Sequence, residues 1–176
     1  MLHNTHTDPL SVALFESPVG ELRLVASRRG LRAVLWPGDI DRSVDAGATS
    51  AAGADAEADA LLVEAARQLR EYFAGDRREF DVPLDPVGTE FQQAAWTVLR
   101  GIPYGETISY GEQARRLGDV NKSRAVGAAN GRNPISIIVP CHRVVGSTGK
   151  LTGFAGGLDT KAWLLGHEQG AEHLPL

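Results

Sequence analysis

The chain has 176 residues, of which 43% are hydrophobic and 23% are charged, and a formal net charge of −4. This length and composition are typical of a globular protein with one or two domains and exclude an intrinsically disordered chain. A single cysteine excludes an intramolecular disulfide and a zinc site built on paired cysteines, and every apolar run is too short to span a membrane. The first ten residues lack the pattern of a secretory signal, so we expect a cytoplasmic protein with a reduced thiol.

The first half of the chain predicts a small sheet domain. Residues 11–36 show apolar alternation and two turn signals, which is typical of a three-stranded antiparallel meander. Residues 37–58 are rich in Ala, Asp and Gly and predict a flexible loop, whereas residues 59–74 have the apolar spacing of a helix that ends before Gly75. Residues 78–84 predict a further strand, and nearby prolines indicate a domain boundary near residue 87.

The second half predicts a mainly α-helical domain. A capping box over residues 89–92 predicts a helix that runs to about Arg100. Ser109 is expected to begin a helix through Leu117, and a second short helix follows over residues 122–131; such a pair with a Gly-containing turn indicates a helix-turn-helix. A last helix is expected over about 159–169. The predicted fold class is therefore α/β of the α+β kind, with a sheet domain over residues 1–87 and a helical domain over 88–176.

Charge is unevenly distributed between the two halves. Residues 1–88 carry 9 basic and 15 acidic side chains, whereas residues 89–176 carry 9 basic and 7 acidic ones. Six basic residues fall within 109–143, against two acidic ones. A polyanionic partner is therefore compatible with the acidic total and would bind the second half, although charge alone equally fits an ordinary solvated surface.

The only cysteine, Cys141, lies between Pro140 and His142. A lone cysteine is more often a small buried hydrophobe than a nucleophile. Here His142 and Arg143 follow directly, and a turn after Pro140 would bring imidazole and thiol together through a water molecule. A nearby base or cation favours the thiolate, so this segment is a candidate nucleophilic site.

The segment IVPCHRV at 138–144 resembles the active-site motif of the O6-alkylguanine-DNA alkyltransferases. The resemblance extends to FQQAAW at 91–96, IPYGETISY at 102–110, RAVGAANGRNP at 124–134 and KAWLLGHE at 161–168, and the first half matches loosely as an N-terminal sheet domain. It implies a DNA repair protein that flips out a damaged nucleotide and transfers the alkyl group of O6-alkylguanine, or less well of O4-alkylthymine, irreversibly to its own cysteine.

The resemblance also implies catalytic roles. Cys141 is the acceptor, His142 deprotonates it through a water molecule, and Glu168 orients His142. Tyr110 donates a hydrogen bond to the leaving guanine, and Asn133 braces the turn behind the cysteine. Without the resemblance, Glu168 fits an ordinary carboxylate near a helix end, and Tyr110 a half-buried aromatic.

DNA contacts follow from the same resemblance. Arg124 would fill the gap left by the flipped base, and the small residues after it would let the helix enter the minor groove, which is only about 6 Å wide. The implied DNA-binding residues are Arg124, Ala125, Gly127, Ala128 and Tyr110, and the implied pocket residues are Val139, Pro140, Phe154 and Ala155. Phe154 and Ala155 depart from the tyrosine and serine of some members, which predicts an altered pocket shape. We expect a monomer that binds double-stranded DNA through the minor groove and uses no metal, cofactor or membrane.

Two other classes of protein compete with this interpretation. A helix-turn-helix regulator with a structural cysteine would need long polar side chains for base readout, but residues 123–131 are mostly Ala and Gly. A Cys-His hydrolase would need an oxyanion hole, and the sequence around Cys141 has no papain-type or caspase-type signature. Transfer of a single methyl group to the protein would separate the alkyltransferase from both.

Overall fold

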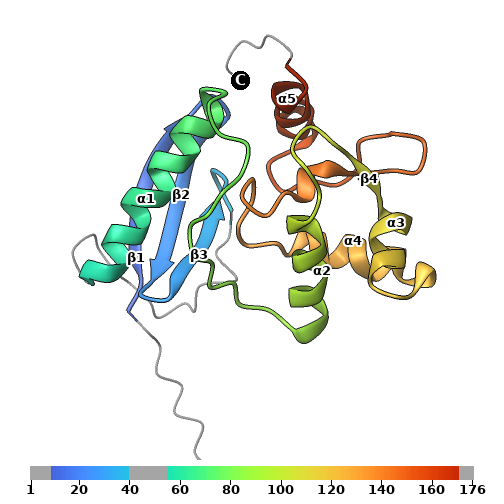
Figure 1. The fold of residues 1–176 in the computed structure, drawn as a ribbon, viewed down its shortest axis with the longest axis horizontal. Coiled ribbons are helices and arrows are strands. Elements are labelled where there is room, and N and C mark those ends of the chain that lie inside the picture. The colour runs from blue at the N-terminus through green and yellow to red at the C-terminus, as the bar shows by residue number, and fades with distance from the viewer. Residues whose placement is uncertain (1–8, 40–54, 171–176) are drawn as a thin grey trace, which may run out of the picture.

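The structure is a computed structural model, and it describes residues 9–39 and 55–170. A three-stranded sheet covered by one long helix lies beside a group of shorter helices (Figure 1). Strands β1 (Ser11–Ser17), β2 (Gly20–Ser27) and β3 (Gly30–Leu35) pair in chain order, all antiparallel, and helix α1 (Ala56–Phe73) packs on them. The predicted meander is confirmed.

Helix α1 begins before the predicted position. Asp55 caps it, since its carboxylate accepts hydrogen bonds from the backbone N–H groups of Glu57 and Ala58 and also binds Arg28 at 2.7 Å. The prediction of a loop over 37–58 is therefore wrong at its C-terminal end, where the helix has already begun. Residues 40–54 of the predicted loop lie outside the described residues. The Ala-rich composition concealed the start, because an N-cap is a local hydrogen bond rather than an apolar pattern.

The predicted strand over 78–84 is wrong. This segment meets β3 at a single bridge, between Leu31 and Leu84. The Leu31 N–H donates to the Pro83 carbonyl at 2.8 Å, and the Asp85 N–H donates to the Leu31 carbonyl at 2.9 Å. Proline has no N–H, so the ladder cannot continue through this segment. A Cβ at Gly30 would lie 2.8 Å from the Pro83 and Leu84 backbones, so glycine permits the contact.

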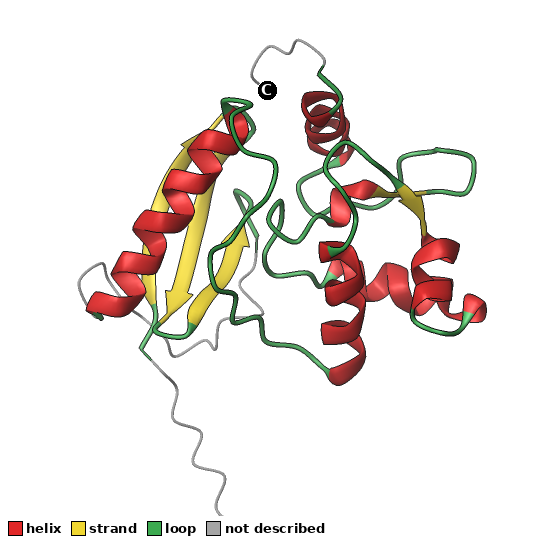
Figure 2. Cartoon of the chain, viewed as in Figure 1, coloured by secondary structure: helices red, strands yellow, loops and turns green. Residues whose placement is uncertain are grey.

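The second half contains the predicted helices (Figure 2). These are α2 (Glu90–Arg100), α3 (Tyr110–Arg116), α4 (Ser123–Gly131) and α5 (Leu158–Glu168), with a short parallel pair, β4 (Ile108–Ser109) and β5 (Val144–Val145). The capping box at Thr89 and the cap at Ser109 are both present. Helices α3 and α4 pack on each other and on α2, as in a helix-turn-helix. None of the described helices is long and apolar enough to cross a membrane.

One hydrophobic core extends through both halves of the molecule. It joins Leu22 and Leu69 of the first half to Leu99, Ile135 and Leu164 of the second. Strand β3 also bonds directly to the segment that precedes the cysteine, because the Val34 N–H donates to the Pro134 carbonyl at 2.9 Å. The sheet therefore supports the backbone that leads to Cys141.

We predict that Gly30→Ala lowers the free energy of unfolding by about 1–3 kcal/mol, because the new methyl group overlaps the backbone of residues 83–84. Gly131→Ala is the matched control, since a Cβ there meets nothing within 4 Å and alanine favours the helix. Urea denaturation of the two variants measures the difference. Equal stabilities would contradict the close contact at Gly30.

Candidate active site around Cys141

The backbone before Cys141 is held by one side chain. The side-chain oxygen Oδ1 of Asn133 accepts a hydrogen bond from the Ile135 N–H at 3.0 Å, and its side-chain nitrogen Nδ2 donates one to the Val139 carbonyl at 2.8 Å. Between these two hydrogen-bonded residues, Ile137 has a φ of 75° and is the only non-glycine residue of the described ranges with positive φ. A β-branched residue rarely adopts this conformation, so surrounding contacts must maintain it. Asn133 supplies two of them.

Cys141 lines a cavity of about 360 Å³. This volume lies in the range of small-molecule sites. The thiol residue is 8% exposed, and Tyr110 lies along the same cavity, with its hydroxyl hydrogen bonded to Thr152. The full lining comprises Tyr110, Gly127, Asn130, Gly131, Asn133, Ser136, Cys141, Thr152, Gly153, Phe154 and Ala155. The cavity thus places a nucleophile and a hydroxyl group around one space.

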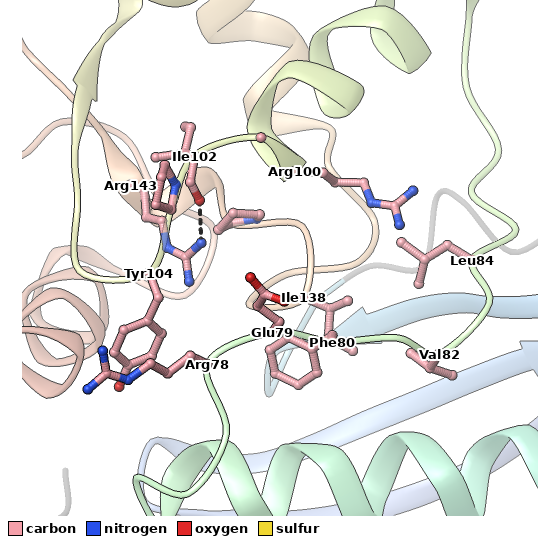
Figure 3. A pocket seen from close by; sticks show the side chains of 13 residues that line it. Arg78, Glu79, Phe80, Val82, Leu84, Arg100, Ile102, Tyr104, Ile138 and Arg143 are labelled. Atoms are coloured by element: carbon pink, nitrogen blue, oxygen red, sulfur yellow. Dashed lines mark hydrogen bonds between the residues drawn. The ribbon is translucent and has the colours of Figure 1, made fainter.

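Two predicted pocket residues lie elsewhere. Phe154 and Ala155 line the cavity, but Val139 and Pro140 do not. Val139 is buried in the core, and Pro140 lines a second cavity of about 340 Å³ that shares no residue with the first. In Figure 3 this second cavity contains the hydrogen bond from Arg143 to the Ile102 carbonyl. Because residues 141–143 form a 3₁₀ turn, successive side chains point to different sides.

A buried carboxylate lies behind the cysteine. Glu168 accepts hydrogen bonds from His142 Nε2 at 2.7 Å, from Arg143 Nη2 at 2.8 Å and from the Tyr72 hydroxyl at 2.9 Å. The side chains of His142 and Glu168 have no exposed surface. Although burial alone would raise the pKa of Glu168, the hydrogen bonds from His142 and Arg143 outweigh it and hold the pKa at about 2. Glu168 is therefore ionised at neutral pH.

The ionised carboxylate determines the tautomer of His142. Nε2 carries the proton that Glu168 accepts, so Nδ1 is the unprotonated nitrogen; we assign this from the hydrogen-bond network. Burial lowers the pKa of His142, against the opposing effect of Glu168. Within the part of the chain that the structure describes, Nδ1 is buried and has no hydrogen-bond partner. His142 is thus a neutral imidazole with a free proton acceptor.

Lys161 is a site residue that sequence reasoning missed. Its side chain is fully buried, and its ammonium donates to the carbonyls of Val144 at 2.6 Å and Thr152 at 2.9 Å. Burial raises the pKa of the Cys141 thiol, and a hydrogen bond from Asn133 and the charge of Lys161 offset part of that rise. A lysine in a helix usually lies on the exposed face, so the residue type alone did not indicate burial. The available signal was its spacing, since Lys161 shares the buried face of α5 with Leu164 and Glu168.

Helix α4 presents the predicted DNA-binding residues beside this cavity. Arg124, Ala125 and Ala128 are exposed, and Gly127 lines the cavity. The Arg124 guanidinium makes no hydrogen bond or ion pair with any residue in 9–39 or 55–170. A Cβ at Gly127 would lie 3.8 Å from the Tyr110 ring, so the helix passes close to the cavity wall. The exposed face of α4 therefore has small side chains, with the unpaired Arg124 guanidinium near its N-terminal end.

The low pKa of Glu168 predicts a pH-dependent stability. The carboxyl titrates near its ordinary value of 4.5 in the unfolded chain and at about 2 in the folded one, so the unfolded state binds more protons between these values. The free energy of unfolding should therefore fall by about 3 kcal/mol as the pH falls from about 5 to 2. Urea denaturation across this range measures the slope, and Glu168→Gln should lack this component. An unchanged slope in Glu168→Gln would contradict the assignment.

Comparison with known proteins identifies the family. One family model, described as "6-O-methylguanine DNA methyltransferase, ribonuclease-like domain", matches residues 10–86, and another, "6-O-methylguanine DNA methyltransferase, DNA binding domain", matches residues 90–170. A methylated-DNA–protein-cysteine methyltransferase from Methanosarcina acetivorans is 50% identical over 153 residues, which cover 87% of this chain and 94% of that protein.

Solved structures agree with these matches. The crystal structure of Mycobacterium tuberculosis O6-methylguanine methyltransferase has a TM-score of 0.77 and 43% identity, and the match covers 93% of this chain and 95% of that one. The structure of M. tuberculosis OGT in complex with DNA has a TM-score of 0.75 and 44% identity, with 92% of each chain covered. With both halves matched and half of the aligned residues identical to a full-length relative, the chain belongs to the 6-O-methylguanine DNA methyltransferase family.

Proposed function

We propose that this protein repairs DNA by transferring the alkyl group of O6-alkylguanine to the thiol of its own Cys141. The observation that carries the proposal is that Cys141 lines a cavity of about 360 Å³ and is followed in sequence by His142, which is buried and paired with Glu168. A bond forms between the Cys141 sulfur and the alkyl carbon, and the bond from that carbon to guanine O6 breaks. The product is a thioether, which water does not cleave, so each molecule reacts once.

The proton of the thiol needs an acceptor, because burial keeps its pKa high. In this mechanism a water molecule relays the proton from Cys141 to Nδ1 of His142, and Glu168 stabilises the resulting imidazolium. Tyr110 donates a hydrogen bond to the leaving guanine and stabilises the negative charge that develops there; the guanine anion then takes up a proton from water, and the His142 imidazolium returns one to water. Asn133 keeps the cysteine turn in place. The free Nδ1 and the position of Tyr110 on the cavity support these roles.

The proposed substrate is double-stranded DNA, and one solved structure of a relative is a complex with DNA. We propose that a monomer places α4 in the minor groove and that Arg124 fills the gap left by the flipped nucleotide. The exposed small residues of α4 and its unpaired Arg124 support this orientation. The short side chains leave little base readout, so binding should depend on salt rather than sequence. The cytoplasm, where thiols stay reduced, is the proposed location.

We predict that Cys141→Ala abolishes alkyl transfer but leaves DNA binding largely intact, because the thiol is the only soft nucleophile of the mechanism. Mass spectrometry after mixing with O6-methylguanine DNA should show a gain of one methyl group in the wild type and none in the variant. A gel-shift assay on the same DNA is the control for binding. Methyl transfer to Cys141→Ala would falsify the mechanism.

A second prediction separates base flipping from chemistry. Arg124→Ala should slow repair of duplex DNA on the order of 10–1,000-fold but leave the reaction with free O6-benzylguanine nearly unchanged, because nothing is flipped in the free base. Tyr110→Phe should slow both reactions, since its hydroxyl acts on the leaving base. Second-order rates of both variants on both substrates test this. Equal slowing by Arg124→Ala would mean that Arg124 belongs to the pocket or the fold.

A further inference from the structure

Trp36, which directly follows β3, contacts residues that line the Cys141 cavity. Its ring packs edge-on against Phe154, with ring centroids 5.5 Å apart and planes at 65°. Its indole N–H donates to the Ser136 hydroxyl at 3.1 Å. Phe154 and Ser136 both line the cavity, whereas Trp36 does not. A residue that directly follows the N-terminal sheet thus contacts two wall residues without lining the cavity itself.

The indole is itself firmly held. It is 5% exposed, and its backbone forms a reciprocal turn with Asp39, in which each residue accepts a hydrogen bond of 3.0 Å from the other's N–H. Just before it, Val34 forms a bridge with Ile135. Trp36 is therefore anchored both to the sheet and to the segment that leads to the cysteine.

The loop that carries Phe154 rests on the indole. A Cβ at Gly156 would lie 2.8 Å from two ring atoms of Trp36 and 3.0 Å from the Phe154 ring. Only glycine allows so close an approach without displacement. Residues 152–155 line the cavity, and this loop contacts Trp36 through Phe154 and closely approaches it at Gly156.

We infer that Trp36 is a positioning residue that holds Phe154 as an aromatic wall and so favours large apolar O6 substituents over methyl. This inference rests on the proposed function. A benzyl ring packs favourably on a fixed aromatic wall, whereas a methyl group presents little surface to it. Without the indole, Phe154 loses its edge-to-face partner and the wall is held less firmly. The substrate preference should then change, even though Trp36 does not touch the substrate.

The test is the ratio of second-order rates on two duplex oligonucleotides, one with O6-benzylguanine and one with O6-methylguanine. We expect Trp36→Leu to lower the benzyl-to-methyl ratio about tenfold and Trp36→Phe, which retains an aromatic ring, to lower it less. A loss of folded protein slows both reactions equally and leaves the ratio unchanged. Phe15→Leu is the matched control, because Phe15 is a buried aromatic of the same sheet that stacks on Phe73 and does not line the cavity.

A double-mutant cycle tests whether Trp36 acts through Phe154. Phe154→Leu should lower the ratio by a similar factor, and the double variant should lower it no further. A ratio for Trp36→Leu within about twofold of the wild type or above it, or two effects that multiply, would overturn the inference. If the wild type accepts neither alkyl group, the proposed function fails and the inference with it; if it accepts both and the ratio does not fall, only the inference fails.

Discussion

Burial of a charge in a protein has a desolvation free energy of several kcal/mol, which partner groups must compensate. Loss of one partner removes part of that compensation and destabilises the fold. Glu168 is such a charge, with no exposed side-chain surface. Its partners come from distant parts of the chain: Tyr72 from α1, and His142 and Arg143 from the turn that carries the cysteine. The carboxylate can stay buried and ionised only when these elements are assembled. The need to compensate this buried charge therefore constrains both the packing of the two halves and the geometry of the site.

The same constraint prepares the chemistry. An ionised Glu168 requires the proton of His142 on Nε2 and leaves Nδ1 as the acceptor. Burial keeps the Cys141 thiol protonated at rest, and Lys161 and Asn133 limit the rise of its pKa. A neutral thiol beside a neutral base is less costly to bury than a thiolate beside an imidazolium. In the proposed mechanism, the ion pair of the reactive state forms only when the thiol proton moves to His142.

The N-terminal sheet takes part in the site although none of its strands carries a proposed catalytic residue. Strand β3 bonds to the backbone at Pro134, and Trp36 supports two residues of the cavity wall. Asn133 then fixes the turn that ends at the cysteine, where Ile137 adopts its unusual backbone conformation. The position of the thiol thus depends on hydrogen bonds from the first half as well as on its own motif.

The sequence by itself determined the elements whose signals are local. Apolar alternation predicted the meander, Thr89 and Ser109 predicted two helix starts, and the motif around Cys141 predicted the family, because each signal lies within a few residues of the structure it specifies. Only the tertiary structure decided the contacts between residues far apart. Tyr72 and Glu168 are separated by 96 residues, and Trp36 and Ser136 by 100.

The corrections have the same physical origin. The segment over 78–84 has the composition of a strand, but Pro83 and the single contact with β3 prevent a ladder. Val139 and Pro140 adjoin Cys141 in sequence, yet Val139 packs into the core and Pro140 lines the second cavity. Lys161 is of a residue type usually found on the surface, and it can be buried because two carbonyl groups accept hydrogen bonds from its ammonium group. Packing between elements decides which side of a turn faces a cavity and which partners a buried charge finds, and a local pattern such as the spacing of Lys161 indicates at most which face of a helix is buried.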